Sequence, residues 1–129
     1  MLRIRPYRSA DGAAIQQWIR DEREHALWCA NLIEYPPSAE ALDRKRQEME
    51  AAGDGAMFTA LDRSGAPIGF FAVMSLELMT NNAHLGFIVV DPGLRGTGVG
   101  LQMVRLATRY CFELLSAGSI TLIVYGQTE

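Results

Sequence analysis

The stretch "DPGLRGTGVG", residues 91–100, places four glycines within ten positions. It follows the apolar run "LGFIVV" (85–90) and precedes "LQMVRLATRYCFELL" (101–115), whose apolar residues are spaced as on one face of a helix. A turn explains Pro92 and Gly93, but glycine at a helix start costs up to about 1 kcal/mol per position relative to alanine. The stretch therefore predicts the order strand, loop, helix, with backbone N–H groups that a ligand approaches closely.

The start of a helix favours an anion, because its first N–H groups lack intrahelical partners and carry the positive end of the helix dipole. Arg95 lies beside these groups as a second contact for an anion. Two common phosphate loops are excluded by single residues. A Walker loop needs lysine after its last glycine, whereas Val99 follows Gly98. A dinucleotide G-x-G-x-x-G loop would place its third glycine at Leu101 or Met103.

The segment Arg95–Gly100 resembles the [Arg/Gln]-x-x-Gly-x-[Gly/Ala] signature of the GNAT N-acetyltransferase superfamily. The longer stretch "FIVVDPGLRGTGVG" is similar to the strand, proline and glycine pattern of that family. The opening "IRPYRSADGAAIQQWIRDE" is similar to that of the family's ribosomal-protein acetyltransferase branch. The resemblance covers nearly the whole chain, and it implies a domain that binds acetyl-CoA as a co-substrate.

The resemblance also implies roles for individual residues. Those expected to bind the pyrophosphate, mainly through backbone N–H groups, are Arg95, Gly96, Thr97, Gly98, Val99, Gly100 and Leu101. The preceding residues Ile88, Val89 and Val90 are expected to pair with the pantetheine arm and to polarise the thioester carbonyl, since backbone donors suit an oxyanion. Their side chains also suit an ordinary sheet core, and the two interpretations are compatible.

The family transfers acetyl directly to an amine, which requires a base for the ammonium and an acid for the departing thiolate. One candidate is Glu77, late in a strand and on the same face as Val73. The other is His84, in phase with Gly86 and Ile88 in the next strand. The plainer structural interpretation, which we favour at both positions, is an exposed strand end for Glu77 and a rim position for His84.

The whole chain, residues 1–129, is predicted as a single domain with a mixed α/β fold. The expected elements are a strand at 2–6, a helix that starts near Ser9 or Asp11 and ends in "RDERE" (20–24), a helix from Ser38 to about Ala52, strands at 56–62, 67–78 and 83–90, a helix from about 98 to 116 and a strand at 120–125. This order predicts a GNAT-like sheet, mostly antiparallel, with helices on both faces. The last strand returns parallel to 83–90 through a right-handed crossover. Segment 25–37 is either an extra turn or a substrate-side loop.

Composition limits the classes of partner. The chain has 129 residues, is 49% hydrophobic and carries a net charge of −3, which argues against a nucleic-acid binder or a polybasic membrane binder. Its first residues lack an apolar signal segment and its longest apolar run is too short to span a bilayer, so we expect a cytoplasmic protein. Cys29 and Cys111 form no CxxC pair, and His25 with Cys29 is too small a ligand set, so no metal site is predicted.

The end of the sequence departs from the family pattern. After the strand matching "ITLIVY" (120–125) the family has an asparagine, a helix that often bears a tyrosine acid, and further strands, whereas "GQTE" follows here. The domain is therefore expected to lack the usual C-terminal helix and strands, and Tyr125 is not expected to be that acid. A homodimer or strand exchange is expected to cover the last strand, because an uncovered strand edge is a liability.

Three functions remain open at this stage. The first is an N-acetyltransferase that moves acetyl from acetyl-CoA to a primary amine of a small molecule or a protein N-terminus. The second is a coenzyme A-binding module whose catalysis is lost because the C-terminal part is missing. The third is a structural domain with a glycine-rich turn and no cofactor.

Overall fold

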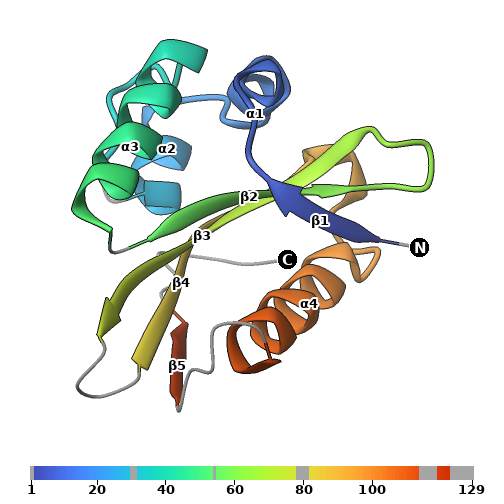
Figure 1. Ribbon diagram of the computed structural model, residues 1–129. Coiled ribbons are helices and arrows are strands. Elements are labelled where there is room, and N and C mark those ends of the chain that lie inside the picture. The colour runs from blue at the N-terminus through green and yellow to red at the C-terminus, as the bar shows by residue number, and fades with distance from the viewer. Residues whose placement is uncertain (1, 30–31, 54, 78–81, 114–118, 123–129) are drawn as a thin grey trace.

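The computed structural model describes residues 2–29, 32–53, 55–77, 82–113 and 119–122. Figure 1 shows one sheet with helices on both faces. The helices are α1 (Gly12–Trp18), α2 (Glu22–Cys29), α3 (Ala39–Ala52) and α4 (Val99–Glu113), with short 3-10 turns η1 (Ser9–Asp11) and η2 (Pro92–Leu94). The strands are β1 (Arg3–Pro6), β2 (Ala56–Leu61), β3 (Pro67–Glu77), β4 (Asn82–Val90) and β5 (Ser119–Leu122).

The strands lie in the order β1-β2-β3-β4-β5, so neighbours in the sheet are also neighbours in the sequence. β1 to β4 pair antiparallel, and β5 pairs parallel to β4. An antiparallel pair needs only a tight turn, and Gly65, with φ 88°, lies in the turn between β2 and β3. A parallel pair needs a crossover, which α4 supplies. The predicted mixed, mostly antiparallel sheet is confirmed.

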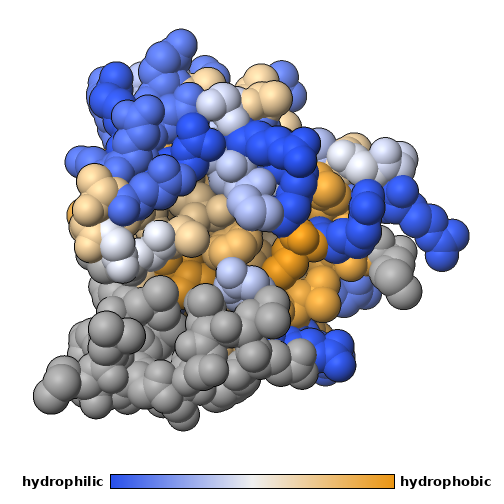
Figure 2. Space-filling model, in the orientation of Figure 1, coloured by the Kyte–Doolittle hydropathy of each residue, from blue (hydrophilic) through white to orange (hydrophobic). Residues whose placement is uncertain are grey.

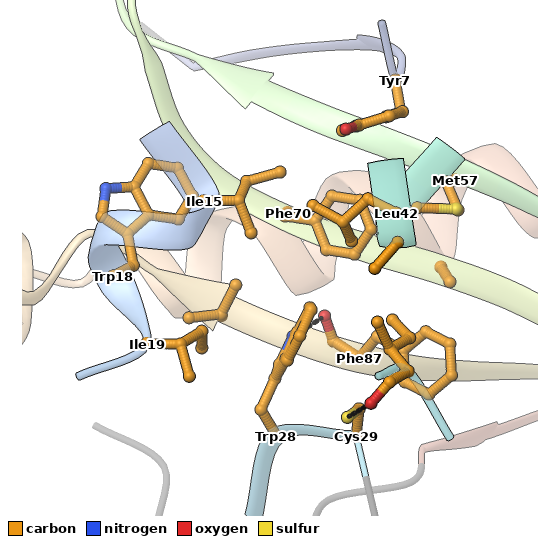
Figure 3. Packing of buried hydrophobic residues seen from close by; sticks show 14 of the residues in the cluster. Tyr7, Ile15, Trp18, Ile19, Trp28, Cys29, Leu42, Met57, Phe70 and Phe87 are labelled. Carbon is orange, nitrogen blue, oxygen red and sulfur yellow. Dashed lines mark hydrogen bonds between the residues drawn. The ribbon is translucent and has the colours of Figure 1, made fainter. Parts of the chain in front are cut away.

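One face of the sheet is covered by α1, α2 and α3. Trp18, Trp28, Leu42, Phe70 and Phe87 belong to the buried cluster on this face (Figure 3). Both tryptophans are 5% exposed, so they lie in the core.

The other face is covered by α4, as Figure 1 shows. Phe58 and Phe71 of the sheet stack with ring centroids 5.3 Å apart and belong to one cluster with Met103, Ala107 and Cys111 of α4. Cys111 is 0% exposed and lies on the buried face of this helix, four residues after Ala107. Burial raises the pKa of the Cys111 thiol, which suits packing rather than nucleophilic chemistry.

The structure departs from the sequence prediction between α1 and α3. α1 ends at Trp18, because Ile19 is extended (φ −102°, ψ 104°). A new helix follows Asp21, whose carboxylate accepts the N–H of Glu24 at 2.8 Å as a helix cap. The predicted single helix through residue 24 is therefore wrong, and α2 occupies the first part of the segment expected to be a turn or loop.

α3 begins and ends where its local signals predict. Ser38 Oγ accepts the N–H of Ala41 at 3.1 Å, and Gly53, with φ 68°, follows the last turn. The buried residues of the helix are Ala41, Leu42 and Met49. Figure 2 shows hydrophilic side chains over the outward side of α3. α3 therefore covers the core and leaves a polar surface.

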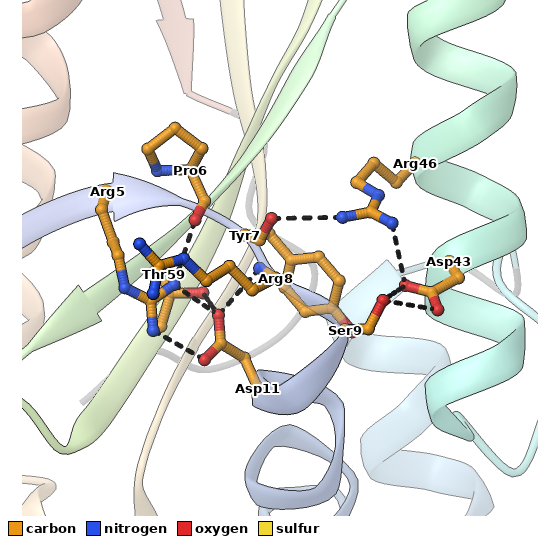
Figure 4. A network of polar contacts seen from close by, with 9 residues as sticks. All are labelled: Arg5, Pro6, Tyr7, Arg8, Ser9, Asp11, Asp43, Arg46 and Thr59. Atoms are coloured by element: carbon orange, nitrogen blue, oxygen red, sulfur yellow. Dashed lines mark hydrogen bonds and ion pairs between the residues drawn. The ribbon is translucent and has the colours of Figure 1, made fainter.

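A buried carboxylate joins β1, η1 and β2 (Figure 4). Asp11 is 3% exposed and accepts hydrogen bonds from both Nη atoms of Arg5 at 2.7 and 2.8 Å, from Arg8 N–H at 2.9 Å and from Thr59 Oγ1 at 2.8 Å. Burial acts to raise the pKa of Asp11, but these hydrogen bonds outweigh burial and hold the pKa below its usual value. Asp11 occupies the predicted N-cap position of α1, yet its side chain does not cap that helix.

Some predictions lie outside the described residues, namely the end of the last helix beyond Glu113 and everything after Leu122. In the described part of the chain, β5 pairs with β4 alone. The expected homodimer or strand exchange stays a prediction. Among the described residues, no helix is both long enough and apolar enough to cross a membrane.

Candidate functional site

The loop between β4 and α4 begins as a turn held by its own hydrogen bonds. The Asp91 carboxylate accepts the N–H of Gly93 at 2.9 Å, and Leu94 N–H donates to Asp91 O at 2.8 Å. Thr97 donates both its N–H and its hydroxyl to Leu94 O. The predicted turn is therefore present, and the Thr97 N–H is already used within the chain.

The next glycines are required by backbone conformation. Gly96 and Gly98 have φ values of 82° and 87°, in the left-handed region that favours glycine. A Cβ at either position would meet no atom within 4 Å. Gly100, by contrast, is buried in the first turn of α4. The space in front of Gly96 and Gly98 leaves room for a ligand to approach the backbone.

The start of α4 presents N–H groups that no described residue uses. Among the described residues, no hydrogen bond involves the N–H groups of Gly96, Gly98 or Val99. The hydrogen bonds of the helix begin with Gln102 N–H, which donates to Gly98 O at 3.1 Å. Unpaired donors at the positive end of a helix dipole suit a phosphate or another anion.

Arg95 adds a positive charge beside these donors. Its side chain is exposed and makes no ion pair with a described residue. The pKa of Glu24 is lowered chiefly by the hydrogen bond from Arg20, and the positive charge of Arg95 also lowers it. The loop therefore lies near α2. Leu101, on the first turn of α4, is 56% exposed, so an apolar surface adjoins the predicted anion site.

β4 contains a β-bulge that the sequence analysis did not predict. Phe70 of β3 lies opposite Val89. Two residues further along β3, Ala72 lies opposite Gly86, so β4 uses one more residue than β3 over the same span. At this point Phe87 takes a φ of 52°, which is unusual for a residue with a side chain.

The bulge changes which side chains share a face. Phe87 and Val89 pack in the cluster under α1 to α3, whereas Ile88 packs against the cluster under α4. The prediction that His84, Gly86 and Ile88 lie in phase is therefore wrong for Ile88, because the extra residue reverses the alternation.

The N–H groups of the predicted pantetheine strand point in two directions. Asp91 N–H donates to Ile68 O of β3 at 2.9 Å. Successive N–H groups along a strand alternate between its two neighbours. That of Val89 therefore points toward β3, while that of Val90 points to the side where β5 lies, and Ile88 lies in the bulge, where this alternation is interrupted.

Among the described residues, β4 is paired with β5 over its first half only. The described pairs run from Asn82 with Ser119 to Leu85 with Leu122. No described residue of β5 lies opposite residues 86–90. An extended ligand can add to an unpaired strand edge by main-chain hydrogen bonds. The edge and the start of α4 are connected by the loop, so one long ligand with a phosphate group can use both.

Trp28 of α2 contacts the bulge directly. Its indole Nε1–H donates to Phe87 O at 2.7 Å (Figure 3). A bulge disrupts the ladder of hydrogen bonds locally, and a buried carbonyl requires a partner. The sequence analysis missed this contact, because the two residues are 59 positions apart and no local pattern links them.

The two predicted catalytic residues lie near the far end of the β3–β4 pair. His84 is opposite Met74 and half-buried, and it has an interaction partner within the chain. Glu77 is opposite Asn82, and the register shifts between Met74 and Glu77, so the face of Glu77 does not follow from that of Val73. The side chain of Glu77 lies outside the described part of the structure. Both catalytic roles stay predictions.

His25 and Cys29 share one face of α2, as their spacing predicts. Both are 0% exposed, and the Cys29 Sγ lies 3.5 Å from His25 Nε2. The same nitrogen donates its N–H to Ile33 O at 2.6 Å. Within the described residues, no group of three or more His, Cys, Asp or Glu side chains is placed to hold a metal ion. The pair therefore belongs to the core.

Residues 1–126 match the family model of the acetyltransferase (GNAT) domain. The chain belongs to the GNAT acetyltransferase family. No curated protein matches its sequence. Among solved structures it is similar to spermidine N-acetyltransferase from Vibrio cholerae in complex with CoA and spermine, with 20% identity and a TM-score of 0.77 over 95% of this chain and 70% of that one. A chimera of the Vibrio cholerae enzyme SpeG and hSSAT gives 20% identity and a TM-score of 0.74 over 94% of this chain and 69% of that one.

At these identities the similarity to solved structures shows the GNAT fold alone. The sequence resemblance to the ribosomal-protein acetyltransferase branch stays a prediction, since the similar structures are spermidine N-acetyltransferases.

Proposed function

We propose that this GNAT domain is an acetyl-CoA-dependent N-acetyltransferase that acts on a primary amine by direct transfer. The observation that carries the proposal is the set of unused N–H groups of Gly96, Gly98 and Val99 at the start of α4, beside the exposed Arg95. These groups suit the pyrophosphate of coenzyme A, which is anionic and makes several hydrogen bonds. The loop thus holds the donor by its backbone.

The edge of β4 at residues 86–90, which no described residue of β5 pairs, supplies the second half of the donor site. The Val90 N–H points to the side where no described β5 residue lies opposite it. We place the Ile88 N–H on the same side, because the Phe87 carbonyl of the same peptide group accepts a hydrogen bond from Trp28 on α2. We assign the Val90 N–H, which is nearer the loop, to the pantetheine arm and the Ile88 N–H to the thioester carbonyl. A backbone donor aimed at that oxygen stabilises the negative charge that develops as the amine attacks.

The transfer forms a C–N bond to the amine and breaks the C–S bond of the thioester. The amine must first lose the extra proton of its ammonium form, and the departing thiolate must gain a proton. His84 and Glu77 are our candidates for these steps, because both residues lie near the same end of the paired strands β3 and β4. The acceptor is a primary amine of a small molecule or a protein N-terminus. The complex of a similar structure with spermine makes polyamines one class to include.

Calorimetry with acetyl-CoA, followed by a thiol-release assay over an amine panel, tests the proposal. The panel contains spermidine, spermine, simple alkylamines and peptides with free N-termini. We expect binding and release of one thiol for each amine acetylated. Binding without release for any amine would support a coenzyme A-binding module that has lost catalysis. Absence of binding at millimolar acetyl-CoA would exclude both functions.

A further inference from the structure

We propose that Trp28 is a positioning residue for the acetyl-transfer reaction, and this inference rests on the function proposed above. Its indole N–H fixes the orientation of the peptide group between Phe87 and Ile88. That peptide group carries the N–H that we assign to the thioester carbonyl. Trp28 therefore acts on the reaction through the backbone and does not contact the substrate.

The peptide group between Phe87 and Ile88 links Trp28 to the Ile88 N–H. The only cis peptide bond among the described residues joins Tyr35 and Pro36, so the Phe87–Ile88 bond is trans. In a trans peptide the C=O and the N–H point in opposite directions. The Phe87 oxygen points to Trp28 on α2. The Ile88 N–H therefore points away from α2, and our assignment places it on the β5 side of the strand, beside the Val90 N–H.

The bulge interrupts the pairing with β3 that would ordinarily orient this peptide group, so a hydrogen bond from outside the sheet is needed to orient it. In regular antiparallel pairing, β3 would fix the carbonyl of each residue that faces it. The register skips one residue of β4 between Gly86 and Val89, and Phe87 adopts a φ of 52° that side chains disfavour. Without the Trp28 indole N–H, the buried Phe87 carbonyl would lose this hydrogen bond, which orients it together with the Ile88 N–H.

Trp28 is itself held rigidly enough to serve this purpose. It is 5% exposed, and its ring lies 6.0 Å from Phe70 and 6.2 Å from Phe87, centroid to centroid. A donor on a packed ring defines a direction more closely than a donor on a flexible chain does. Oxyanion stabilisation depends on such placement, since a misplacement of about 1 Å can cost on the order of a hundredfold in rate.

A merely structural role would satisfy the buried carbonyl and nothing more, so the test must separate stability from catalysis. Replacing Trp28 with 3-benzothienyl-L-alanine keeps the ring shape and exchanges the N–H for sulfur. The matched control makes the same exchange at Trp18, which lies in the same core cluster and is also 5% exposed. The indole of Trp18 makes no hydrogen bond to any described residue.

We expect kcat at position 28 to fall by about ten- to a hundredfold, with the Kd for free coenzyme A within about twofold of the unmodified protein. The exchange at position 18 should leave kcat unchanged. Trp28→Phe, with Trp18→Phe beside it, repeats the comparison with natural residues. An unchanged kcat at position 28, or equal losses at both positions, would overturn the inference. If the unmodified protein releases no thiol, the proposed function fails first and this inference fails with it.

The Ile88 amide resonance in a ¹H–¹⁵N spectrum gives a readout in the protein without turnover. With acetyl-CoA bound, it should move relative to the complex with coenzyme A, and the exchange at position 28 should abolish that difference. The same difference persisting after the exchange would contradict the role assigned to the indole N–H.

Discussion

The polar cluster around Asp11 and the loop before α4 use their hydrogen-bonding groups in opposite ways. The Asp11 carboxylate is 3% exposed and receives donors from two arginines and Thr59, all within the chain. The loop instead leaves the N–H groups of Gly96 and Gly98 without an acceptor among the described residues. The Asp11 cluster stabilises the fold, whereas the loop before α4 leaves backbone N–H groups available to a ligand.

The difference in hydrogen bonding distinguishes polar groups that stabilise the fold from polar groups that suit ligand binding, and this distinction needs no comparison with related proteins. A buried carboxylate with four hydrogen bonds is costly to disturb, because removing one partner leaves the others unpaired. An exposed loop with unpaired donors costs little while water solvates it, and it gains when an anion replaces the water. Substitutions at the two regions should therefore affect stability and ligand binding separately.

The largest expected effect is on ligand binding at Gly98. Gly98→Val puts a side chain into the open space in front of the loop, so the Kd for acetyl-CoA should rise by at least about a hundredfold. Gly53→Val is the matched control, since Gly53 also has a positive φ, 68°, and would also meet no atom within 4 Å. Both variants should lose about 1–2 kcal/mol of unfolding free energy from left-handed strain. Calorimetry and chemical denaturation measure the two quantities.

Equal affinity in the two variants would show that the loop does not contact the donor. A Gly98→Val protein that fails to fold while Gly53→Val folds would show that the loop is structural.

The next effect concerns stability, at Asp11. Burial acts to raise the pKa of this carboxyl, but the hydrogen bonds from Arg5, Arg8 and Thr59 lower it further than burial raises it. A carboxyl with a lowered pKa in the folded state stabilises the protein above its unfolded-state pKa of about 4. That stabilisation is lost as the pH falls through the folded-state value. The unfolding free energy should therefore decrease on acidification below about pH 5.

Asp11→Asn should lower the unfolding free energy at neutral pH by about 3 kcal/mol, because it leaves the Arg5 guanidinium without its counter-charge. Its stability should also respond less to acid than that of the unmodified protein. Asp43→Asn is the comparison, since Asp43 is less buried and should lose only about 1 kcal/mol. Denaturation at several pH values and calorimetry with acetyl-CoA test this. A similar acid response in the Asp11→Asn protein, or a large loss of acetyl-CoA affinity, would break the contrast between the two regions.

Features with local signals could be predicted from the sequence. The cap at Ser38, the stop at Gly53 and the turn at Gly65 each depend on residues within one turn, and each is present. α2 also has a local signal, Asp21 with Glu24 three residues later, but the charged run looks equally like the end of the preceding helix.

The β4 bulge could not be predicted in the same way, because it is a property of the pairing between β3 and β4. The isolated Gly86 inside an apolar strand was the one available hint. The turn at Asp91 and the start of α4 have local signals and are present where they were predicted, whereas the contact between Trp28 and Phe87 depends on tertiary packing and was not predicted. Local sequence patterns thus predict the loop before α4 but not the contacts that orient the β4 bulge.

The smallest expected effect concerns the exposed Arg95. Arg95→Ala should raise the Kd for acetyl-CoA by about five- to tenfold at low salt, since an exposed charge contributes on the order of 1 kcal/mol to an ion pair. The unfolding free energy should change little, because Glu24 keeps its hydrogen bonds with Arg20. At about 1 M salt, where charges are screened beyond about 3 Å, most of the loss should disappear. Arg63→Ala removes an equally exposed arginine from the turn between β2 and β3 and is the control. A loss of affinity in both variants would indicate a general effect of net charge, whereas a loss only at Arg95 that screening abolishes would place this charge beside the bound pyrophosphate.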